Sequence, residues 1–262
     1  MKKLIALFMA ASLCAALICG CGKKEEPSAA SAGTPDGTAA ETPTQAAATQ
    51  AAAPQGDMVD PHWFDDAVFV GDSITTTLED FCFDDPNLLG DADFVCADSL
   101  SYHNAQWDLN DENAVHPTIQ GETVLAETAA EITGSSKIFI LMGINDIDTY
   151  GVEDTMASMK EFIRKVLSHS PNVEIYLQST TPMIPAKETD ILNNVLIRQF
   201  DEELELYCNE NGYHYLDVYH RMCDENGALR ADYCVDPEDD GIHFTYDATI
   251  VWVNYLRSAV AG

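Results

Sequence analysis

The chain has 262 residues and a formal charge of −31, from 44 acidic and 13 basic side chains. This balance argues against nucleic acid or an anionic membrane surface as a partner, because both need a basic patch and the sequence contains none. The eight cysteines include no Cys-x-x-Cys pair and no metal-ligand spacing, so we expect no metal site.

The start of the chain predicts an export signal over residues 1–20. A basic Met1-Lys2-Lys3 precedes an apolar run over 4–18, which is too short and wrongly flanked for a membrane-spanning helix. The stretch 17–21 resembles a bacterial lipobox, with Gly20 just before Cys21. The resemblance implies lipidation of Cys21 and attachment to the extracytoplasmic face of the cell membrane through that lipid alone. An ordinary signal peptide cut near Gly22 is the alternative.

The composition changes after the signal. Residues 21–56 are rich in Ala, Thr, Pro, Ser, Gln and Gly and have almost no large apolar side chain. Such a segment buries too little surface to offset its chain entropy, which predicts a disordered tether. Residues 57–262 have the length of a single domain.

Strands and helices alternate through this domain. Apolar runs predict five strands, at 67–70, 93–97, 137–142, 173–177 and 213–218. Helical patterns fall at 74–81, 122–132, 152–168, 189–209 and 246–260. This order favours an α/β fold, a three-layer sandwich around a five-stranded, mainly parallel sheet. The long polar connection over 98–121 predicts a functional loop or lid.

Ligands bind such sheets at the carboxyl ends of the strands, so the residues after each strand are the candidates. Asp72-Ser73 follow the first strand, Gly143-Ile144-Asn145-Asp146 follow the third, and Asp240-Gly241-Ile242-His243 precede the last helix. A serine nucleophile needs a base, and a histidine base needs a carboxylate to fix its tautomer. An amide such as Asn145 can donate to an oxyanion. The alternative is that Asp72 or Ser73 only caps the following helix.

These motifs, in this order over 68–243, resemble the SGNH (GDSL-like) hydrolase superfamily. The resemblance implies a flavodoxin-like sheet of order 2-1-3-4-5 and catalysis without metal or organic cofactor. It also implies Ser73 as nucleophile, His243 as base and Asp240 as its partner, with Asn145 and the Ser73 N–H in the oxyanion hole. Asp236 and Asp239 are nearby alternatives to Asp240, which the three-residue spacing to His243 favours.

The second block of the family departs from its pattern. Family members usually place a glycine after the second strand, whose N–H points at the oxyanion. This chain has Ala97-Asp98-Ser99-Leu100-Ser101 there. We expect Ser99 in the glycine position, with Ser101 as the alternative.

Three functions fit these residues. The first is an extracytoplasmic serine esterase that removes a short acyl group, expected to be acetyl, from a carbohydrate or related ester. The second is an O-acyltransferase with the same triad, and the third is a lipoprotein that binds a glycan or partner protein without turnover.

Two groups of residues keep open interpretations. Tyr102, His103, Trp107 and His116 in the polar connection are candidates for substrate contact, the aromatic ones by stacking on a sugar ring. A disulfide between Cys223 and Cys234 is conceivable but is not established by the spacing.

Overall fold

The computed structural model describes residues 57–261. The expected signal peptide, the lipidation site at Cys21 and the expected tether lie outside these described residues. Within the described range, no helix combines the length and apolar character needed to cross a membrane.

Five strands form a parallel sheet of order β2-β1-β5-β6-β7. Their bounds are β1 Ala67–Gly71, β2 Asp93–Cys96, β5 Lys137–Leu141, β6 Glu174–Gln178 and β7 His214–Leu216. In chain order of the five strands this is the expected order 2-1-3-4-5, and the expected fold class is confirmed. A separate antiparallel pair, β3 Thr118–Ile119 and β4 Glu122–Thr123, lies in the long connection after β2.

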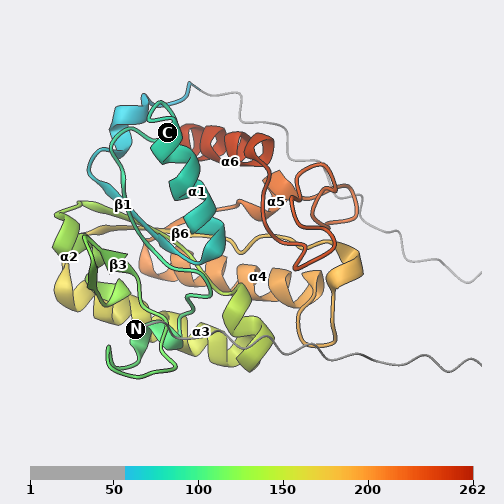
Figure 1. Cartoon of the computed structure of the whole chain (residues 1–262), viewed down its shortest axis with the longest axis horizontal. Helices are drawn as coiled ribbons and strands as arrows, with labels where there is room; N and C mark the ends of the chain where they lie inside the picture. The colour runs from blue at the N-terminus through green and yellow to red at the C-terminus, as the bar shows by residue number, and fades with distance from the viewer. Residues whose placement is uncertain (1–56, 262) are drawn as a thin grey trace, which may run out of the picture. The chain divides into compact units, whose positions relative to one another are not determined.

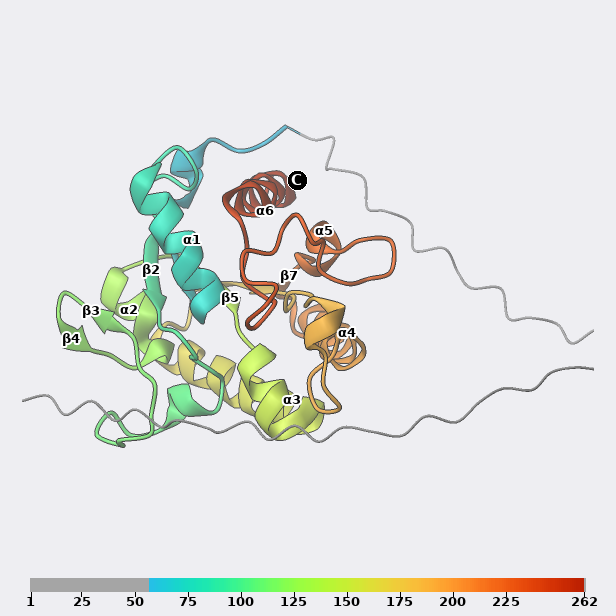
Figure 2. The ribbon, with the colours of Figure 1, turned by 45° about the vertical axis from the view of Figure 1, so that its right-hand side comes forward.

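Helices cover both faces of the sheet, which gives three layers (Figures 1 and 2). On one face lie α1 Ser73–Asp84 and α6 Tyr246–Ala259, and on the other lie α2 Ala129–Thr133, α3 Ile144–His169 and α4 Asn194–Asn211. The short α5 Tyr219–Met222 follows β7. Short 3₁₀ helices lie before β1 and in the connections: η1 Pro61–Phe64, η2 Asn104–Gln106, η3 Ala126–Thr128 and η4 Pro185–Lys187. Strand side chains alternate between the layers, because successive residues of a strand point to opposite faces.

A row of stacked rings crosses the face of the sheet that α1 and α6 cover. Neighbouring ring centroids in the row lie 4.3–5.3 Å apart. Each ring comes from a different strand, in the order Phe94, Phe69, Phe139, Tyr176 and His214. The strand register places these residues directly opposite one another, so their ring contacts stabilise the pairing of neighbouring strands.

The structure differs from the sequence prediction in the region before β5. The helix expected over 122–132 is wrong over most of its length, because the chain first forms β4 and η3 and only then the five-residue α2. Helix α3 begins earlier than expected, directly after Gly143, and bends at Gly151, whose φ of 77° and ψ of 174° are not helical. Cys223 and Cys234 are both free thiols in the structure, so the disulfide is not formed there.

Candidate active site

Ser73 begins helix α1, directly after the buried strand β1. The Asp72 side chain caps this helix, with its Oδ1 accepting from the Ile74 N–H at 3.1 Å. The preceding residue has to be glycine, because a Cβ on Gly71 would lie 2.0 Å from Thr75 Oγ1 and 2.5 Å from the Leu141 carbonyl oxygen. The tight turn leaves Ser73 half-buried at the carboxyl edge of the sheet.

His243 lies beside Ser73, although 170 positions separate them in the chain. Its Nε2 is 2.9 Å from Ser73 Oγ, which is hydrogen-bonding distance. The other ring nitrogen, Nδ1, is 2.6 Å from Asp236 Oδ2, and the His243 backbone N–H donates to Asp236 Oδ1 at 3.1 Å. The three side chains thus form a continuous serine–histidine–carboxylate relay.

The carboxylate of this relay corrects the sequence prediction, which assigned the role to Asp240. Asp240 is exposed, and although its carboxylate is near His243, the hydrogen bonds to that residue come from Asp236. The reason is the shape of the loop between them. Cys234 and Phe244 form an isolated antiparallel β-bridge, and the Val235 N–H donates to the His243 carbonyl oxygen. The chain therefore doubles back and places Asp236 against His243.

The electrostatics of the pair set the histidine tautomer. Partial burial alone would raise the pKa of Asp236, but the hydrogen bonds from the His243 ring, the Cys234 thiol and the His243 N–H lower it below its ordinary value. The carboxylate is therefore ionised at neutral pH and can only accept, which places the proton of neutral His243 on Nδ1. Its Nε2 is then left to accept the proton of the Ser73 hydroxyl.

Asn145 reaches the same edge of the sheet from the first turn of α3. Its Nδ2 donates to the Leu100 carbonyl oxygen at 3.2 Å and to Asp72 Oδ2 at 3.3 Å. Asp72 is fully buried, and burial raises its pKa to about 7 against the opposing hydrogen bond from the Ile74 N–H. The carboxylate that caps α1 therefore also orients the amide of Asn145.

The turn before Asn145 also depends on glycine. Gly143 has a φ of 132°, and a Cβ there would lie 2.9 Å from the Phe200 ring. A larger residue would have to move both the backbone and the ring, so Gly143 fixes where α3 begins.

Asp146 has a role that the sequence pattern did not indicate. Its buried carboxylate accepts from the Tyr102 N–H at 2.8 Å and from the His103 N–H at 2.9 Å. Burial raises the pKa of Asp146, and these hydrogen bonds oppose the rise. Asp146 thereby ties the loop after β2 to the start of α3. The partners are 43 and 44 positions away, and no local signal could have identified them.

The two serines of the second block differ in backbone geometry. Ser99 has a φ of 61°, in the left-handed region that glycine favours, while the Ser101 N–H is already engaged with Asn104 Oδ1 at 2.8 Å. This difference supports Ser99 over Ser101 as the oxyanion donor, and that role stays a prediction.

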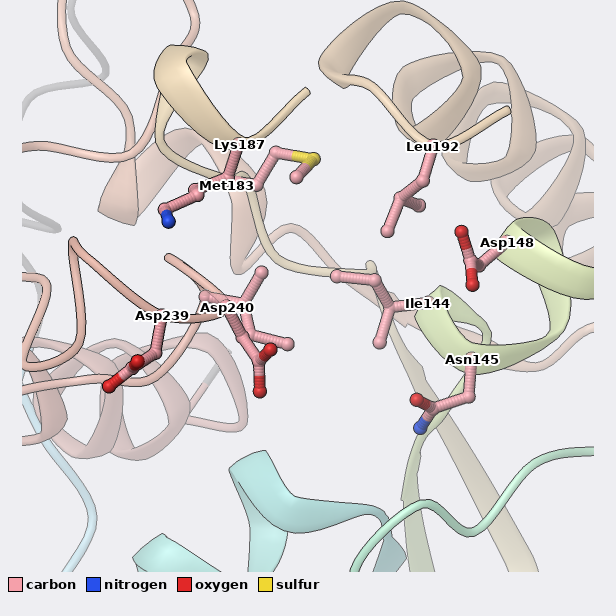
Figure 3. A pocket seen from close by; sticks show the side chains of 9 residues that line it. Ile144, Asn145, Asp148, Met183, Lys187, Leu192, Asp239 and Asp240 are labelled. Carbon is pink, nitrogen blue, oxygen red and sulfur yellow. The ribbon is translucent and has the colours of Figure 1, made fainter. Parts of the chain in front are cut away.

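A cavity of about 300 Å³ opens beside this edge (Figure 3). Asn145 and Asp148 project from the start of α3, and Asp239 and Asp240 come from the loop before α6. Four apolar side chains and one lysine complete the lining: Ile144, Met183, Leu192, Ile242 and Lys187. The space therefore combines an apolar surface with carboxylates at its rim.

Of the four residues of the polar connection that we considered for substrate contact, none lines this cavity. Tyr102 is fully buried and packs edge-on against Phe162, so it cannot stack on a sugar. His103 and Trp107 line a different cavity.

Among the described residues, one group could hold a metal ion. It consists of Asp236, Asp240 and His243, whose potential ligand atoms lie within 4.8 Å of one another. Two of these residues form the relay with Ser73. A cation bound there would compete with the hydrogen bond between Asp236 and His243, so it would oppose the relay.

Comparison with known proteins agrees with this geometry. Residues 69–248 match the model of the GDSL-like lipase and acylhydrolase family. No functionally curated protein matches the sequence.

Among solved structures, the fold is similar to that of a GDSL-like lipase from Bacteroides thetaiotaomicron, with 16% identity, a TM-score of 0.53, and coverage of 78% of this chain and 91% of that one. It is also similar to a lipase/acylhydrolase from Enterococcus faecalis, with 14% identity, a TM-score of 0.51, and coverage of 72% and 92%. A third similar structure is the acetylxylan esterase Axe2 from Geobacillus stearothermophilus, with 14% identity, a TM-score of 0.50, and coverage of 75% and 94%.

Proposed function

We propose that this chain removes a short acyl group from a carbohydrate ester outside the cytoplasm, with acetyl as the first candidate. The chain belongs to the GDSL-like lipase and acylhydrolase family, a family of carboxylic ester hydrolases. The observation that carries the proposal is the relay from Ser73 through His243 to Asp236, with its contacts of 2.9 and 2.6 Å.

In the first half of the reaction, His243 Nε2 takes the proton of the Ser73 hydroxyl as Oγ attacks the ester carbonyl carbon. Asp236 stabilises the imidazolium that forms. The carbonyl oxygen becomes an oxyanion, which accepts hydrogen bonds from the backbone N–H groups of Ser73 and Ser99. Asn145 Nδ2 is the third donor, and it exchanges its hydrogen bond to the Leu100 carbonyl oxygen or to Asp72 for one to the oxyanion. The C–O bond to the alcohol then breaks, His243 returns the proton to the alcohol oxygen, and Ser73 keeps the acyl group.

In the second half, water replaces the alcohol. His243 takes a proton from the water as its oxygen attacks the acyl carbon, and the tetrahedral intermediate uses the same donors. Collapse breaks the bond to Ser73 Oγ, which regains its proton from His243, and the acid leaves. Apart from the water, every group named in these steps belongs to this chain.

The substrate proposal has three supports. The cavity of about 300 Å³ beside Asn145 has room for a short acyl group or part of an alcohol. The export signal predicted over residues 1–20 would direct the domain out of the cytoplasm, where acylated glycans are available. One structure of similar fold is an acetylxylan esterase.

The test measures acid release from aryl acetate, propionate and butyrate by the full-length chain. We expect turnover that decreases as the acyl group lengthens and that is lost in both Ser73→Ala and His243→Ala. A matched control is His220→Ala, because His220 also pairs with a carboxylate, Asp217, at 2.9 Å. That variant should keep full activity.

A folded wild-type chain that releases no acid from any of the three esters would contradict the proposal. Adding a sugar acceptor to the acetate assay separates hydrolysis from acyl transfer. Hydrolysis predicts free acetate in proportion to the alcohol released, whereas transfer predicts acetylated sugar.

A further inference from the structure

A second cavity, of about 340 Å³, lies outside the site described above. Its lining comes from the loop after β2 and from the middle of α3: His103, Gln106, Trp107, Ala157, Ser158 and Glu161. It shares no lining residue with the cavity beside Asn145. Trp107 is 36% exposed, so part of its ring system faces solvent rather than the protein core.

One wall of this second cavity is held rigidly. His103 Nδ1 lies 3.2 Å from Asp146 Oδ1, its Nε2 lies 3.1 Å from Ser158 Oγ, and its ring stacks on Tyr150 at a centroid distance of 3.8 Å. This serine–histidine–aspartate arrangement repeats the pattern of the first site but not its chemistry. Ser158 lies inside α3, where backbone N–H groups are used by the helix and cannot form an oxyanion hole.

The groups around the cavity match the two kinds of surface that a sugar ring presents. An exposed indole offers an apolar face for the C–H side of the ring. Both hydrogens of Gln106 Nε2 are engaged, with the Tyr102 and Ser158 carbonyl oxygens, so the amide offers its Oε1 to a hydroxyl donor. The Glu161 carboxylate is a second acceptor, held on the surface by its ion pair with Arg164.

The position of the cavity relates it to the candidate active site. His103, which forms its wall, is hydrogen-bonded to Asp146, and the adjacent residue Asn145 lines the other cavity. The linings of the two cavities are therefore linked through the adjacent residues Asn145 and Asp146. A ligand that extends over several units in a row could reach from one cavity to the other.

We propose that the Trp107 cavity is a carbohydrate-binding subsite, which holds a neutral sugar unit of a glycan whose acylated unit occupies the site at Ser73. The binding of a neutral sugar at Trp107 follows from the cavity alone. Its link to deacylation rests on the proposed function.

The binding test uses the full-length Ser73→Ala variant, so that no turnover interferes. Tetrasaccharides of xylose, glucose and N-acetylglucosamine, all without O-acetyl esters, are titrated by calorimetry. We expect at least one to bind, and Trp107→Ala in the same background to weaken its binding about tenfold through the lost stacking surface. Trp107→Phe should restore most of the affinity. Leu109→Ala is the matched control, because Leu109 is an exposed apolar residue of the same loop that does not line the cavity.

The subsite inference is overturned if none of the three tetrasaccharides binds at about 10 mM, or if Trp107→Ala binds as well as its parent. A turnover assay tests the link with Ser73 intact. Trp107→Ala should hydrolyse aryl acetate at the wild-type rate, and its kcat/KM on an acetylated tetrasaccharide should fall about tenfold. Absence of aryl acetate turnover in the wild type would refute the esterase proposal and leave the binding result standing. Equal kcat/KM of the variant and the wild type on the acetylated tetrasaccharide would refute the link.

Discussion

Replacing Asp236 and Asp240 with asparagine, one at a time, tests which carboxylate serves His243. In the structure Asp236 Oδ2 lies 2.6 Å from Nδ1 and Oδ1 accepts the His243 N–H at 3.1 Å. Asparagine keeps the shape but can turn an NH₂ group toward Nδ1. Nδ1 would then accept, so the proton would move to Nε2 and Nε2 could no longer take the proton of Ser73.

The expected loss for Asp236→Asn is about 10⁴-fold in kcat, or about 5.5 kcal/mol of transition-state stabilisation. Asp240 lies near His243 but is exposed, so water screens its charge, and the hydrogen bonds to His243 come from Asp236. Asp240→Asn should therefore change kcat by no more than about threefold.

The assay is initial-rate hydrolysis of an aryl acetate at neutral pH, with thermal unfolding followed in parallel to show that both variants fold. Asp240→Asn is the matched control, since it removes an acidic charge from the same loop. If Asp240→Asn lost activity by several orders of magnitude while Asp236→Asn stayed within about tenfold of wild type, the tautomer argument would be wrong.

Three further substitutions test other parts of the site. Asn145→Ala should lower kcat by about 10²- to 10³-fold with little change in KM, since in the proposed mechanism its amide donates to the oxyanion. A rate close to wild type would remove Asn145 from that role. Asp72 has a folded-state pKa of about 7 against 3.8 for the free group, so the stability it contributes is complete below about pH 4 and is lost as the pH rises to 7. The unfolding free energy of Asp72→Asn should therefore exceed that of wild type increasingly between pH 4 and pH 7, by up to about 4 kcal/mol. Denaturant titrations at several pH values measure this difference, and a difference that does not change with pH would contradict the raised pKa of Asp72. Gly71→Ala should destabilise the fold by about 3 kcal/mol or more, because its Cβ would lie 2.5 Å from the immobile Leu141 carbonyl oxygen, and an unchanged melting temperature would refute this packing argument.

The sequence alone determined the architecture and much of the site. Alternating apolar runs and helical patterns predicted the sheet, because burial on both faces of a parallel strand requires a continuous apolar run. Since carboxyl ends of parallel strands share one edge, the same pattern predicted Ser73 and Asn145 at one edge of the sheet. The motif resemblance paired Ser73 with His243, and the structure places these two side chains within hydrogen-bonding distance. Such features are local, and a short stretch of chain is enough to predict them.

Tertiary structure decided the rest. Asp236, Asp239 and Asp240 are three neighbouring aspartates that the sequence does not distinguish as partners of His243. The antiparallel β-bridge between Cys234 and Phe244 folds their loop so that Asp236 lies against His243. Likewise, Asp146 contacts the loop after β2 across more than 40 positions. The helix expected over 122–132 was replaced in part by β4, which pairs with β3, and by η3. In each case the deciding free energy comes from contacts between distant segments, which propensity and spacing within one segment do not contain.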